Sequence, residues 1–107
     1  MTDEDWPRTG RDLGGWTQDE AVAYEVACEL LTGMVAWCSS EIAKERARPT
    51  PDVAVIQRWE SDSARYAREQ RELDPADDAE VVRVTRVYGE QLREHYEQVR
   101  ASGEAGG

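Results

Sequence analysis

Paired carboxylates are the residues in this sequence that could most readily do chemistry. Glu25 and Glu29 are four residues apart, as are Glu41 and Glu45, so each pair would share one face of a helix. Such pairs can bind a divalent metal or transfer protons. The chain has 23 acidic residues, so pairs also arise by chance, and we interpret these as solvated carboxylates. Glu25 and Glu29 lie in an apolar stretch, which leaves a small carboxylate metal-dependent enzyme as one open function.

The single histidine and the two cysteines do not complete a known site. A Glu-x-x-His di-iron motif is missing at His95, because Leu92 stands three residues before it. Cys28 and Cys38 would be roughly 15 Å apart along one helix, too far for a disulfide. No other Cys or His is near enough in sequence to make a zinc site. We therefore predict structural roles and reduced thiols, and we assign no catalytic residue, metal or cofactor.

Length and composition favour one folded, acidic domain. The chain has 107 residues and a formal net charge of −10, with 39% hydrophobic residues, four Trp and four Tyr. That content is too apolar for a disordered chain, and the length fits a single domain. The acidic balance disfavours nucleic acid and anionic membrane surfaces, which attract basic faces. Arginine outnumbers lysine 12 to one, and Asn and Phe are absent, which indicates a GC-rich bacterial genome.

Three helices are predicted, in an up-down-up antiparallel bundle. The first covers 18–47, with Thr17 and Glu20 as a capping box. The second covers 52–72, with Thr50 as N-cap and Pro51 in the first turn; the third covers 75–101, with Asp74 as N-cap before Pro75. The helical domain as a whole is expected at 17–102, between a Gly- and Pro-containing irregular leader (1–16) and a frayed tail (103–107). A set of residues three and four apart forms the predicted core seam of the first helix: Ala21, Tyr24, Cys28, Leu31, Val35, Cys38 and Ile42.

The first helix has more apolar surface than two neighbours can cover. Residues 21–38 contain two charges, Glu25 and Glu29. We do not predict a membrane span, because each Glu would cost a few kcal/mol and no basic flank sets an orientation. The acidic N-terminus does not resemble a signal peptide. A second apolar row is predicted to mediate self-association: Val22, Val26, Leu30, Gly33 and Trp37. The alternative is that Trp6 and Trp16 of the leader cover this row.

These observations predict a small cytoplasmic, non-catalytic protein that acts by protein–protein interaction or regulation through a helix face, as a homodimer. Two alternatives stay open. One is an inhibitor that presents acidic faces to a basic target, such as a toxin or a nucleic-acid-binding protein. The other is the small metal-dependent helical enzyme named above.

Overall fold

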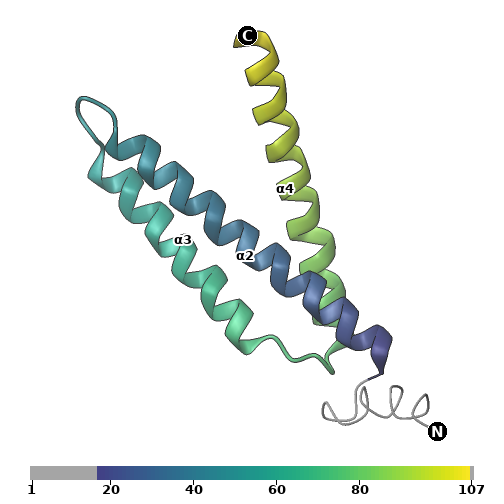
Figure 1. Cartoon of the computed structure of the whole chain (residues 1–107). Helices are drawn as coiled ribbons and strands as arrows, with labels where there is room; N and C mark the ends of the chain where they lie inside the picture. The colour runs from purple at the N-terminus through teal and green to yellow at the C-terminus, as the bar shows by residue number, and fades with distance from the viewer. Residues whose placement is uncertain (1–16, 107) are drawn as a thin grey trace, which may run out of the picture.

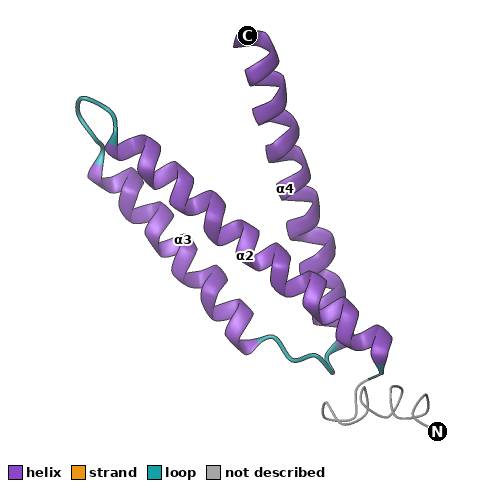
Figure 2. Ribbon diagram, viewed as in Figure 1, coloured by secondary structure: helices purple, strands orange, loops and turns teal. Residues whose placement is uncertain are grey.

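A computed structural model describes residues 17–106 and has three helices in this range and no strand (Figures 1 and 2). They are α2 (Gln18–Arg46), α3 (Val53–Glu72) and α4 (Asp78–Gly106). The predicted all-α, up-down-up arrangement is confirmed. The leader, with Trp6 and Trp16, lies outside the described residues.

The start of α2 follows the predicted capping box. The Glu20 backbone N–H donates to Thr17 Oγ1 at 3.1 Å, and the Thr17 N–H donates to Glu20 Oε1 at 2.9 Å. The backbone N–H groups of Thr17 and Glu20, which have no carbonyl partner within the helix, are thereby paired with side chains. Asp19 and Glu20 also place negative charge at the positive end of the helix dipole.

The starts of α3 and α4 were predicted one and three residues too early. Asp52, and not Thr50, caps α3, because its side chain accepts a hydrogen bond from the Ala54 N–H at 3.0 Å. Asp74 closes a turn by accepting from the Ala76 and Asp77 N–H groups at 2.9 Å. Asp77 then accepts from the Glu80 N–H at 3.1 Å, and α4 begins after it. Each linker offers two capping residues, and the chain uses the second one.

The end of α4 was predicted too early. Ser102 and Gly103 were expected to end the helix, but it continues to Gly106. Gly103 meets no other group within 4 Å of where its Cβ would be, so no tertiary contact turns the chain there. A helical glycine costs only about 1 kcal/mol relative to alanine, which one position can tolerate.

Helix α2 lies between the other two helices. Both α3 and α4 pack against it, whereas no Cα atom of α3 comes within 8 Å of one of α4 (Figure 1). Gln70 of α3 donates to the Cys28 carbonyl and the Thr32 hydroxyl of α2, both at 2.8 Å. The buried hydrophobic core contains Ala27, Leu31, Met34, Cys38, Tyr66, Leu73, Val81, Val84, Tyr88 and Leu92.

The most buried side of α2 differs from the predicted seam. Only Leu31 and Cys38 of the predicted set are buried, together with Ala27, Met34 and Glu45. The other seam residues are half-buried: Ala21, Tyr24, Cys28, Val35 and Ile42. The reason is that α2 has two neighbours in different directions, so its best-covered positions lie between them.

Helix α2 is long and apolar enough to cross a membrane, judged by length and composition alone. Core helices of water-soluble proteins share these properties. Only 22% of its most apolar window is buried against the described part of the chain. Much apolar surface of α2 is therefore left for contacts outside the bundle.

Candidate functional site

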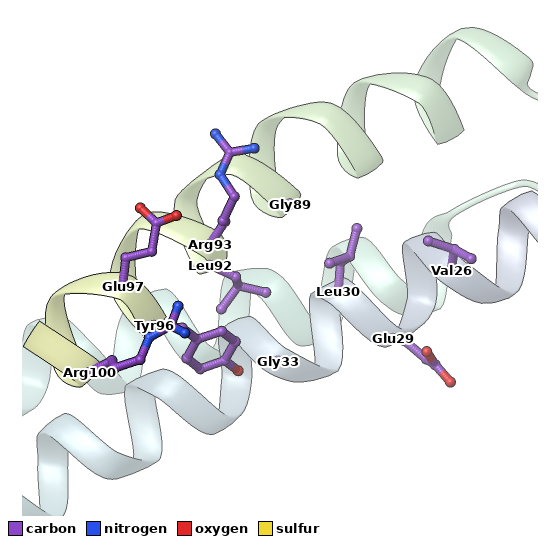
Figure 3. A pocket seen from close by; sticks show the side chains of 10 residues that line it. All are labelled: Val26, Glu29, Leu30, Gly33, Gly89, Leu92, Arg93, Tyr96, Glu97 and Arg100. Carbon is purple, nitrogen blue, oxygen red and sulfur yellow. The ribbon is translucent and has the colours of Figure 1, made fainter.

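A hollow with a volume of about 470 Å³ lies between α2 and α4 (Figure 3). Val26 and Leu30 line it from α2, and Leu92 and Tyr96 line it from α4. A second apolar hollow continues the same surface toward the start of α4, between Val26 and Val82. Exposed apolar side chains line these hollows: Val26 lies in both, Tyr96 in the first and Val82 in the second, and each is between 43% and 57% exposed. Val22, one turn before Val26, is 51% exposed. We call this surface the α2–α4 face.

The predicted self-association row is divided by the fold. Leu30, Gly33 and Trp37 contact α4 within the same chain. Leu30 Cδ1 lies 3.7 Å from the position of a Cβ on Gly89, and Leu92 Cδ1 lies 2.9 Å from that of a Cβ on Gly33. Val22 and Val26 stay exposed. A close approach thus accounts for the mid-helix glycine at position 33.

Trp37 joins all three helices. Its ring stacks on His95 of α4, with centroids 4.1 Å apart, and lies at a tilt to Trp59 of α3 at 6.2 Å. His95 is half-buried, as expected for a structural histidine at the edge of the core. Trp37 therefore connects α3 and α4 to α2 and packs, half-buried, against the core of the bundle.

Opposite charges border the two edges of the α2–α4 face. On the α2 edge, Glu25 and Glu29 are exposed. On the α4 edge, Arg86 and Arg93 are exposed, and Glu97 is exposed near Arg93 and lines the same hollow. Arg100 is exposed as well, and Figure 3 shows its side chain reaching toward Tyr96. Figure 3 shows the Glu29 carboxylate pointing away from α4 and the Arg93 guanidinium pointing away from α2, with the apolar side chains between them.

The carboxylates considered for catalysis do not converge. No group of three or more His, Cys, Asp or Glu among the described residues could hold a metal ion. Cys28 and Cys38 are free cysteines, and burial raises the pKa of the Cys38 thiol, which disfavours the reactive thiolate. The described residues therefore present no such metal-binding group, and the environment of Cys38 does not favour a thiolate.

Glu45 is buried, although it was predicted to be solvated. It is 8% exposed, and its carboxylate accepts from the Asp52 N–H at 2.9 Å and from Arg48 at 3.0 and 3.2 Å. These bonds tie the end of α2 to the residue that caps α3. The four-residue spacing between Glu41 and Glu45 could not predict this role of Glu45. The role depends on the path of the loop, which brings the Asp52 N–H back to the Glu45 carboxylate.

Glu45→Ala is expected to lower the free energy of unfolding by about 2 kcal/mol, because it leaves the Asp52 N–H without its acceptor. Chemical denaturation would measure the loss. Glu41→Ala is the matched control: its partner is the exposed Lys44, so its cost should stay below about 0.5 kcal/mol. Equal costs for the two variants would contradict the role of Glu45.

A hydrogen-bonded cluster connects α3 with α4. The Tyr88 hydroxyl donates to the Glu69 carboxylate, with O···O distances of 3.0 and 2.9 Å. Arg83 lies 3.3 Å from Glu69 and binds Glu80 through two hydrogen bonds of 2.6 and 3.0 Å. Burial, and then the bond to Glu69, raises the pKa of Tyr88. Among the described residues, no buried side-chain N or O atom lacks a hydrogen-bond partner. The polar groups of the cluster are therefore satisfied, and the cluster acts as a structural link between α3 and α4.

The raised Tyr88 pKa predicts a loss of stability in alkali. The neutral phenol is favoured in the folded chain, so its contribution is complete below the unfolded pKa of about 10 and is lost as pH rises through the folded value. Tyr88→Phe should cost about 1 kcal/mol at neutral pH and should flatten the decline above pH ~10. Tyr96→Phe, at an exposed tyrosine, is the control and should keep the wild-type pH profile. An unchanged alkaline slope in Tyr88→Phe would refute this role.

Comparison with known proteins gives no relative for this chain: no family model, no curated protein and no solved structure matches it. The α2–α4 face and its charged edges are therefore the features from which a function can be inferred.

Proposed function

We propose that this protein is a small, non-catalytic cytoplasmic interaction or regulatory protein that binds protein through the α2–α4 face. The observation that carries the proposal is the exposure of Val26, Val82 and Tyr96 in two adjoining apolar hollows, with Val22 exposed one turn from Val26. Monomeric proteins rarely leave contiguous apolar surface of this kind in water, and such surfaces mark contact sites. The free thiols of Cys28 and Cys38 agree with a reducing compartment.

The acidic-inhibitor alternative draws less support from the described surface. Several carboxylates are paired within the chain: Glu41 with Lys44, Glu60 with Arg46, and Glu69 and Glu80 with Arg83. Paired charges give a weak field toward a basic target. An apolar face with aromatic Tyr96 is closer to the composition of protein interface cores.

Site-specific photo-crosslinking in cells tests the proposed function. A benzophenone amino acid in place of Tyr96 should form covalent adducts with protein, whether with a second copy or with a different chain. The control position is Val53 at the start of α3, which is 63% exposed and lies away from the face. An absence of adducts at position 96, or the same adducts at both positions, would overturn the proposal.

A further inference from the structure

The α2–α4 face is self-complementary in the sense that a two-fold dimer requires. Across the face, the order is the acidic edge of Glu25 and Glu29, then Val22 and Val26 of α2, then the exposed residues of α4, and then the basic edge. On α4, Val82 and Tyr96 are exposed and Gly89 between them is half-buried; the basic edge is formed by Arg86 and Arg93, with Glu97 next to Arg93. A two-fold axis along the mean direction of α2 and α4, which diverge toward the end of α4 in Figure 1, reverses this order in the partner copy.

From these features we infer that a second copy of this chain occupies the α2–α4 face, with α2 of each copy on α4 of the other. The inference rests on the proposed function and names the partner of that face. In this arrangement, the valines of α2 meet the Val82–Tyr96 row of the partner copy. The acidic edge of each copy then meets the basic edge of the other, twice per dimer.

The positions of the charged residues along the helix axes agree with this pairing. Within one chain, Leu30 lies beside Gly89 and Gly33 beside Leu92, so α2 and α4 run in the same direction at matching heights. A two-fold rotation about an axis along the helices leaves each residue of the partner copy at the same position along that axis. Glu25 and Glu29 are then within about two helical turns of Arg86 and Arg93 of the other copy, which is in reach of long side chains.

Charge excludes the two simpler dimers. If α2 packed on α2 of a second copy, the acidic edges would meet, and Leu30, Gly33 and Trp37 would be unavailable because α4 already covers them. If α4 packed antiparallel on α4 of a second copy, the arginines of one copy would face the arginines of the other. Like charges across an interface oppose association, so the crossed pairing is the one that the surface favours.

The extent of the face suits a reversible dimer. From Val82 to Tyr96, α4 runs about 21 Å, and two adjacent helices give a footprint of roughly 400 Å². Specific interfaces of standard size bury about 800 Å² per partner, and smaller ones are transient. We therefore expect self-association in the micromolar range.

Charge reversal on each edge tests the crossed pairing. Glu25→Arg/Glu29→Arg and Arg86→Glu/Arg93→Glu should each weaken self-association of the full chain tenfold or more in sedimentation experiments, because each places like charges together twice. Mixed in equal amounts, the two variants should restore the dimer as a heterodimer, since both edge contacts are then opposite in charge. Circular dichroism should show unchanged helix content in each variant.

Controls on other exposed positions separate edge contacts from net charge. Glu90→Arg/Glu94→Arg and Arg58→Glu/Arg71→Glu change the net charge as the two edge variants do, at exposed residues that do not line the face. They should keep wild-type association, and their mixture should show nothing new. Equal weakening in these controls would overturn the crossed pairing.

Each other occupant gives a different result. An α2-on-α2 dimer would survive Arg86→Glu/Arg93→Glu, and an α4-on-α4 dimer would survive Glu25→Arg/Glu29→Arg. If the segment 1–16 of the same chain covers the face, the wild type is monomeric and mixing has no effect. A Tyr96 photo-adduct with a different protein alone would refute the second copy while the proposed function stands.

Discussion

Trp37→Ala is expected to lower the free energy of unfolding by about 3 kcal/mol, within the range for removing a large aromatic side chain from a packed site. Trp37 contacts the rings of Trp59 on α3 and His95 on α4, so its loss loosens both packing partners of α2 at once. For a domain of this size, the melting temperature should fall by more than about 10 °C. Thermal melting and chemical denaturation would measure the change.

Smaller substitutions at the same contact give the controls. Trp37→Phe keeps an aromatic ring against His95 and should recover part of the loss. His95→Ala removes only the α4 side of the contact and should cost less than Trp37→Ala. If Trp37→Ala cost under about 1 kcal/mol, Trp37 could not be the residue that holds the three helices together.

Val26→Glu should abolish self-association while the chain stays helical. Val26 is 43% exposed on the α2–α4 face, so a glutamate there is solvated in a monomer but would be desolvated in the dimer. We expect the dissociation constant to rise by a factor of about 100 or more, equivalent to a cost near 3 kcal/mol. Sedimentation velocity over a concentration series would measure it.

Val53→Glu is the matched control for Val26→Glu. Val53 is 63% exposed and lies at the first position of α3, where negative charge suits the helix dipole. This variant should associate like the wild type. If both variants dissociated equally, the effect would come from added charge and not from the α2–α4 face.

The helices could be predicted because their signals are local. The Thr17–Glu20 capping box is predicted from four adjacent residues, and both of its hydrogen bonds are present. The starts of α3 and α4 were missed because Thr50 and Asp52, and Asp74 and Asp77, are all capable caps. Local sequence does not show which of two possible N-cap residues is used, because this depends on the path of the linker.

The candidate site could be predicted only in part. Val22 and Val26 are exposed as predicted, but the contribution of α4 to the face was missed. Apolar residues surround α2 so evenly that their spacing does not show which row faces α3 and which faces α4. The exposed side of α4 does have a signal in the sequence, since Val82 and Tyr96 are fourteen residues apart and Arg86, Arg93 and Arg100 recur every seven residues beside them.

The mass of the wild-type chain in solution tests the central claim, that the α2–α4 face binds a second copy. Sedimentation equilibrium of the full-length protein should show the mass rising with concentration in the micromolar range, from 12.1 kDa toward twice that value, and levelling there. A mass that stays at 12.1 kDa up to hundreds of micromolar, or one that climbs past the dimer without a plateau, would contradict the account.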